Sequence, residues 1–155
     1  MIDIVTLIDI NKAIVNIVTQ ALNDTEFSTV KFSSTSIEEN ISRPSLYLDF
    51  ETNKTNRFNY SLKERNLNVK LFYFTKTKDN SKIELMKIQD ILESLFLKAI
   101  KVNEDLYFNA SEVEFDVNKK DGYLTANLEL YSLEEIDFID NAEMMETLEF
   151  NTKIN

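Results

Sequence analysis

Apolar residues recur every three or four positions in two stretches of this chain, a spacing that predicts two amphipathic helices. The first stretch covers roughly residues 3–22, and the second begins at Ser81 and ends near Ala99. Ser81 and Glu84 fit a capping box, in which each side chain accepts a hydrogen bond from the backbone N–H of the other residue. We expect buried stripes made of Ile4, Leu7, Ile8, Ile14, Val15, Val18 and Leu22, widened by Ile10 and Ile17, in the first helix, and of Leu85, Ile88, Ile91, Leu92, Leu95 and Phe96 in the second.

Alternation of apolar and polar residues after the first helix predicts β-strands. The single proline, Pro44, has no N–H and favours extended geometry in the residue before it, so it is expected to open a strand. In that strand Leu46, Leu48 and Phe50 share one face. We therefore expect this face to pack on the helices.

A polar loop is expected over residues 51–60, before a strand over residues 67–74. Beyond the second helix, alternating residues lead up to Asp121-Gly122 and away from it, which predicts a hairpin whose turn needs a positive φ at the glycine. The alternating residues are Val113, Phe115 and Val117 before the turn and Leu124, Ala126, Leu128 and Leu130 after it.

Helices combined with hairpin strands predict an α+β fold, in which an antiparallel or mixed β-sheet carries two main helices packed on one face. The length of 155 residues suits one domain, because a chain of this size buries enough surface for a single core. We place a single α+β domain at residues 1–131. Residues 132–155 are acidic with scattered apolar residues, and they are expected to form either a C-terminal arm that orders on a partner or a terminal element of the same domain.

The chain has no His, no Cys and a single Gly, which removes most of the groups that enzymes use. Without His and Cys there is no side chain that ordinarily titrates near neutrality, no thiolate nucleophile and no soft metal ligand. One glycine cannot build the glycine-rich loops that bind phosphate. The acids from Glu134 to Asp140 could hold a hard cation, but their spacing is not that of an EF-hand loop. The sequence therefore predicts no enzyme activity, no cofactor and no metal site.

The net charge is −10, and it is segregated along the chain. Residues 51–82 hold eight Lys or Arg against three acids, whereas residues 129–155 hold eight acids against one Lys. Such segments are either solvated faces that keep the protein soluble or complementary surfaces that meet between copies. For the second interpretation, the candidate contacts with other copies or partners are Lys54, Arg57, Lys63, Arg65, Glu134, Glu135, Asp137, Phe138, Ile139, Asp140 and Met144.

The same acidity argues against readout of a nucleic-acid sequence, because binding to phosphates needs a basic surface. No uncharged apolar stretch reaches the length of about 18 residues that spans a bilayer, so we expect no membrane contact. The first residues lack a basic region and carry Asp3 and Asp9, so no secretion signal is expected and the cytoplasm is the expected location.

Three features taken together resemble a known protein family. An N-terminal amphipathic helix is followed by Ile41-Ser42-Arg43-Pro44-Ser45-Leu46-Tyr47-Leu48 and then by Arg65-Asn66-Leu67-Asn68-Val69-Lys70-Leu71-Phe72-Tyr73-Phe74. Over about residues 3–131 this layout resembles the phage tail terminator (tail-completion) proteins of prophages and phage-tail-like bacteriocins of Gram-positive bacteria. The resemblance implies a structural α+β subunit that forms a ring, commonly a hexamer. That ring would cap the tail tube at its head-proximal end, stop its polymerisation and present a head-joining or collar surface.

The resemblance also implies partners and a location. The partners are other copies of the chain and the tail tube protein, with a sheath or head-completion protein as a further candidate. Assembly would take place in the bacterial cytoplasm, and the protein would then be part of the phage or tail-like particle.

Two other classes stay open from the residues alone. An acidic inhibitor or immunity-type protein that mimics nucleic acid would gather its carboxylates on one contiguous face. A hydrolase based on carboxylates would bring two acids together in a pocket that raises the pKa of one of them.

Overall fold

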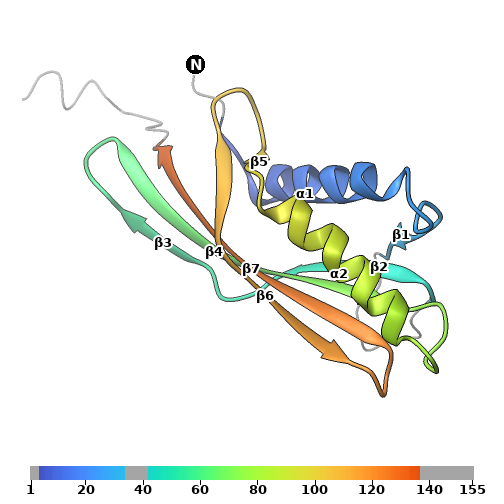
Figure 1. The fold of residues 1–155 in the computed structure, drawn as a ribbon. Helices are drawn as coiled ribbons and strands as arrows, with labels where there is room; N and C mark the ends of the chain where they lie inside the picture. Colours follow the sequence, from blue (N-terminus) through green and yellow to red (C-terminus); the bar gives the residue numbers. More distant parts are fainter. Residues whose placement is uncertain (1–3, 34–41, 137–155) are drawn as a thin grey trace, which may run out of the picture.

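The computed structural model describes residues 4–33 and 42–136. Two helices lie on one face of a curled, mixed β-sheet, as Figure 1 shows, and this confirms the predicted α+β fold. In chain order the elements are α1 (Leu7–Leu22), β1 (Lys31–Phe32), β2 (Ser45–Phe50), β3 (Lys54–Arg57), β4 (Leu62–Phe74), α2 (Lys82–Phe96), β5 (Ile100–Lys101), β6 (Tyr107–Asn118) and β7 (Tyr123–Glu135).

The sheet is centred on two long strands, β4 and β7. The strand order is β1-β2-β4-β7-β6-β5, and β3 pairs with β4 on the same side as β2. Neighbouring strands are antiparallel except for the short parallel pair of β1 and β2. β4 and β7 pair over 13 residues each, from Leu62 opposite Glu135 to Phe74 opposite Tyr123.

The core lies between the helices and one face of the sheet. α1 buries Ile10, Ile14, Val18 and Leu22, at a uniform spacing of four. α2 buries Leu85, Ile88, Leu92 and Phe96, while Ile91 and Leu95 pack at the margin, so the stripe expected for this helix is confirmed. From the sheet, alternate residues of β4 and β7 complete the core, namely Leu67, Val69, Leu71 and Tyr73 with Leu124, Ala126, Leu128 and Leu130.

The stripe expected at the start of α1 is wrong. Ile4, Leu7 and Ile8 are exposed, whereas Ile10, placed at the margin by the sequence pattern, is fully buried. The helix begins only at Leu7 because Thr6 and Asp9 form a capping box, in which Asp9 N–H donates to Thr6 Oγ1 at 3.1 Å and Thr6 N–H donates to Asp9 Oδ2 at 2.9 Å. These hydrogen bonds lower the pKa of the Asp9 carboxyl.

The capping box predicted for α2 does not form. Ser81 has a helical backbone conformation, and its side chain makes no cap hydrogen bond. The Glu84 carboxylate instead accepts hydrogen bonds from Tyr73 OH at 2.7 Å and from Lys76 N–H at 3.1 Å. Burial and the bond to Glu84 both raise the pKa of the Tyr73 phenol. A buried donor on β4 thus takes the glutamate away from the helix end and ties α2 to the sheet.

The strand after Pro44 is confirmed, and it lies second from the edge of the sheet. Leu46 is fully buried, while Leu48 and Phe50 pack at the margin of the core. The loop expected over residues 51–60 is wrong in part, because it contains β3. All four residues of β3 are exposed, so neither face of this strand has the apolar alternation that reveals a strand in a sequence.

The hairpin at Asp121-Gly122 is confirmed, and Gly122 has φ +67°. Its carbonyl accepts hydrogen bonds from Thr75 N–H at 2.9 Å and from the Arg43 guanidinium at 3.1 Å. The same guanidinium donates to the Asp121 carbonyl at 2.6 Å and to the Thr75 carbonyl at 3.2 Å. Arg43 therefore fixes the start of β2 to the β6–β7 turn and the end of β4.

Replacing Gly122 with alanine should destabilise the protein by about 1–3 kcal/mol, because L residues rarely adopt this backbone conformation. The added Cβ would also lie 2.6 Å from Thr75 Oγ1. Chemical denaturation followed by circular dichroism measures the change. Lys120→Ala, at an exposed position of the same turn, is the control and should change stability by less than about 0.5 kcal/mol. Equal losses for both variants would contradict the backbone argument.

Candidate subunit and partner interface

A three-stranded arm extends from the body of the subunit. We define the arm as β3, the turn at residues 58–61, the start of β4 (62–66) and the end of β7 (131–135). Figure 1 shows it continuing past the ends of both helices, as the green hairpin and the red end of β7. Such a projection, with no helix above it, is accessible to other molecules.

A buried ion pair holds the base of the arm together. Arg65 Nε on β4 lies 3.4 Å from Glu134 Oε2 on β7, and these side chains are only 11% and 8% exposed. Ser132 Oγ donates a hydrogen bond to the same carboxylate oxygen, and Arg65 Nη1 donates to the Val5 carbonyl at 3.5 Å. The arm is thereby attached both across its own strands and to the segment before α1.

A second contact crosses between the same two strands. Tyr131 OH on β7 donates to Glu64 Oε1 on β4 at 3.1 Å. Loss of hydration, followed by the hydrogen bond and charge of Glu64, raises the pKa of the Tyr131 phenol. This hydrogen bond adds a second side-chain contact between β4 and β7 within the arm.

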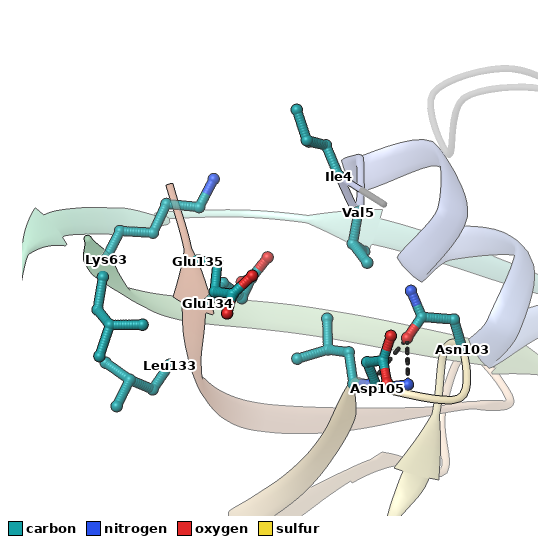
Figure 2. Close-up of a pocket in the computed structure, with 10 residues that line it drawn as sticks. Ile4, Val5, Lys63, Asn103, Asp105, Leu133, Glu134 and Glu135 are labelled. Atoms are coloured by element: carbon teal, nitrogen blue, oxygen red, sulfur yellow. Dashed lines mark hydrogen bonds between the residues drawn. The ribbon is translucent and has the colours of Figure 1, made fainter. Parts of the chain in front are cut away.

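An open hollow of about 570 Å³ lies where the arm meets the body. Figure 2 shows Lys63 and Leu133 of the arm across from Ile4, Val5 and Asp105. On the side of the body, residues 103–106 line the hollow. The Asn103 side chain holds this segment in place, because its Oδ1 accepts hydrogen bonds from the N–H groups of residues 105 and 106 at 2.8 Å each. The lining mixes one lysine, several carboxylates and aliphatic side chains.

Exposed apolar side chains gather on the arm. At its tip Phe58 is 55% and Tyr60 is 62% exposed, and on β7 Tyr131 and Leu133 are each more than 40% exposed. Aromatic side chains are the commonest anchors of protein interfaces. The sequence patterns did not indicate these residues, although two aromatic residues within an otherwise polar segment were the available signal.

The structure brings six of the eleven predicted interface residues together on the arm. These are Lys54, Arg57, Lys63, Arg65, Glu134 and Glu135. The other five, Asp137, Phe138, Ile139, Asp140 and Met144, lie outside the described residues. The expected boundary after residue 131 falls within β7, which continues to Glu135.

Charge complementarity at the base of the arm is satisfied within one chain. Arg65 and Glu134 neutralise each other there, and Lys63 lies opposite Glu134 in the strand register. The other described residues of the predicted interface, Lys54, Arg57, Lys63 and Glu135, stay predicted contacts with other copies or partners. Among the described residues no group of His, Cys, Asp or Glu is arranged to hold a metal ion.

Replacing Arg65 with methionine should cost about 3–5 kcal/mol of stability, because it leaves the buried Glu134 carboxylate without its cation. Unfolding in urea measures this loss. The double variant Arg65→Met/Glu134→Leu removes both charges and should recover most of the stability. A loss below about 1 kcal/mol for the single variant would contradict a buried pair.

No helix within the described ranges is both long and apolar enough to cross a membrane. A search of curated proteins found no match. The model of one protein family, described as phage tail terminator protein, matches residues 9–147. The matched range contains nearly all of α1, every strand and the whole arm. Because the match spans most of the 155 residues, the chain belongs to the phage tail terminator family and is a structural protein of phage tail assembly.

Proposed function

We propose that this chain forms a closed ring, a hexamer as the family resemblance suggests, on the head-proximal end of the tail tube. The ring stops polymerisation of the tube and presents the surface to which a head or collar binds. Membership of the terminator family carries this proposal, since it makes the chain a virion component that contacts other tail components. Assembly in the bacterial cytoplasm precedes incorporation into the particle.

The shape of the subunit supports a capping role. A cap must bind the last ring of the tube through one surface and keep another surface free. The arm offers a surface that could bind the tube. Its strands are held together by the Arg65–Glu134 pair, and Phe58 and Tyr60 are exposed at its tip. Anchors on a fixed support lose little conformational entropy on binding.

Capping is tested by tube length. Purified tube protein polymerised in the presence of this chain should give shorter tubes, measured by electron microscopy, than tube protein alone. Phe58→Ala/Tyr60→Ala should abolish the shortening while leaving thermal stability unchanged, because both side chains are exposed. Leu97→Ala, at an exposed position remote from the arm, is the control and should shorten tubes as the unaltered chain does. Tubes of unchanged length with the unaltered chain would contradict capping.

The acidic residues beyond Ile136 are proposed contacts between copies, with Phe138, Ile139 and Met144 as apolar anchors and Asp137 and Asp140 as charges. Light scattering across a salt series tests this with the intact chain and a chain ending at Ile136, which keeps all of β7. The intact chain should have a larger mass at low salt, because exposed ion pairs are screened over about 10 Å at 0.1 M salt. Equal masses for both chains at every salt concentration would contradict a role for this segment.

The acidic inhibitor is the second candidate function. Such a protein needs carboxylates gathered on one contiguous face, and one face of the sheet has several. Four carboxylates, those of Glu112, Glu114, Asp116 and Glu129, alternate on the face of the sheet that points away from the helices. A monomer that blocks a nuclease would support this function. Family membership favours the terminator.

A further inference from the structure

The sheet leaves several strand edges unpaired among the described residues, including the outer edges of β1 and of residues 47–50 in β2. The outer edges of β6 and β3 are two more. β5 pairs with only the first part of β6, through Ile100 opposite Phe108 and Lys101 opposite Tyr107. From Ser111 to Asn118 the outer edge of β6 has no described partner. At the opposite side of the sheet, no described strand lies beyond β3. Unpaired strand edges are templates on which another strand can pair.

The register shows which backbone groups these edges present. Ile136 N–H donates to the Ser61 carbonyl at 2.9 Å. Because backbone N–H and C=O groups point to alternate sides along a strand, the even-numbered residues of β7 form their backbone hydrogen bonds with β4 and the odd-numbered residues form theirs with β6. As a result, the N–H and C=O groups of Val113, Phe115 and Val117 point away from β7. The bond from Phe58 N–H to the Leu62 carbonyl, also 2.9 Å, likewise points the backbone groups of residues 55 and 57 away from β4.

The two edges carry opposite charges. β3 has Lys54 and Arg57 and no acid, whereas residues 111–118 of β6 have three acids and no cation. Lys54 lies on the same outer face of the sheet as these acids, while Arg57 lies on the helix-bearing face. Glu112 lies directly opposite Glu129 across β6 and β7, a pairing of like charges that destabilises an isolated sheet. In the described part of the chain neither of these two carboxylates has a cationic partner. A basic strand beside β6 would supply one.

We propose that β3 of one copy pairs with the outer edge of β6 in the next copy, so that the sheet continues from subunit to subunit. This inference rests on the proposed ring and names its contact. The strands alternate in direction from β3 through β4 and β7 to β6, so a neighbour of the same orientation brings β3 to β6 antiparallel. Side chains of Thr55 and of Val113, Phe115 and Val117 then share the helix-bearing face.

A second copy is the occupant because the two edges are unlike and complementary. A contact between unlike surfaces of the same chain is heterologous, and it closes into a ring when its rotation divides a full turn. The two edges also lie at different positions along the strand direction. In the strand register, β3 lies alongside residues 131–134 of β7, whereas the free edge of β6 lies alongside residues 123–129 of β7. Successive copies are therefore staggered along the strands, as strands are in a closed barrel.

Disulfide cross-linking tests the contact directly, because the chain has no cysteine of its own. Thr55→Cys is combined in turn with Val113→Cys, Phe115→Cys and Val117→Cys in the full chain, and each double variant is oxidised at low salt. Opposite residues of antiparallel strands have Cα atoms about 4.5–5.5 Å apart, within the range of a disulfide. At least one pair should give a ladder of cross-linked oligomers in non-reducing electrophoresis, and each single-cysteine variant should stay monomeric under denaturing conditions.

Reversal of charge gives an independent readout of the same contact. Glu112→Lys/Glu114→Lys and Lys54→Glu should each raise the concentration needed for assembly by about tenfold or more at low salt, because like charges then meet on the outer face of the interface. The two changes combined in one chain should restore assembly. Lys12→Glu is the control, since it makes the same change in net charge at an exposed helix-side position as Lys54→Glu does.

The outcomes separate this contact from the ring itself. A ring of the unaltered chain that gives no ladder and ignores both charge reversals overturns the edge contact and leaves the ring standing. A dimer from Val117→Cys alone also overturns it, because that product requires two copies of β6 to meet. If the unaltered chain is a monomer in light scattering at every concentration and salt, both the ring and its contact are wrong.

Discussion

The pairing of β4 with β7 along their whole length is the constraint on which the rest of the structure depends. Each strand has 13 residues, and a single register runs from Leu62 opposite Glu135 to Phe74 opposite Tyr123. The helices cover only the part of this ladder that lies in the body of the subunit (Figure 1). The same two strands must therefore build the centre of a core at one end and a solvated arm at the other.

Along the paired strands β4 and β7, the side chains on the helix-bearing face change from apolar to polar between Leu67 and Arg65. Leu67 lies opposite Leu130, and both are buried in the core. Two residues farther along, Arg65 lies opposite Ser132, and both contact Glu134. A buried charge without a partner loses its hydration with no compensation, so the arginine and glutamate are stable there only as a pair. The ion pair thus marks where the core ends and keeps the strands aligned beyond it.

Sequence patterns predict the body of the subunit well, because burial imposes periodicity. The stripe of α2, the strand after Pro44 and the turn at Gly122 each follow from one such rule, and the structure has all three. The capping box at Ser81 fails because a tertiary donor, Tyr73 OH, competes for Glu84. Local rules do not include partners that arrive from distant parts of the chain.

The arm was predictable only in part, because its exposed residues are under no burial constraint and therefore show no apolar period. β3 is exposed on every residue, so no apolar period reveals it. Charge was the signal on which the prediction rested, and the residues that it selected between Lys54 and Arg65 do lie with Glu134 and Glu135 on one structural unit. Charge alone could not show that Arg65 and Glu134 meet within a chain, since that depends on strand register, which the sequence does not display.

Asymmetry of the sheet is the feature of the fold that bears on the proposed ring. A subunit whose two edges were alike would favour a two-fold pair, in which the same surface meets itself. Here one edge is short and basic, and the other is longer and acidic and includes the like-charged opposition of Glu112 and Glu129. Within one subunit that opposition only costs stability. In the proposed ring a cation from a neighbouring copy lies beside the same carboxylates, and the repulsion within one subunit is offset by an attraction that orients the contact and sets its register.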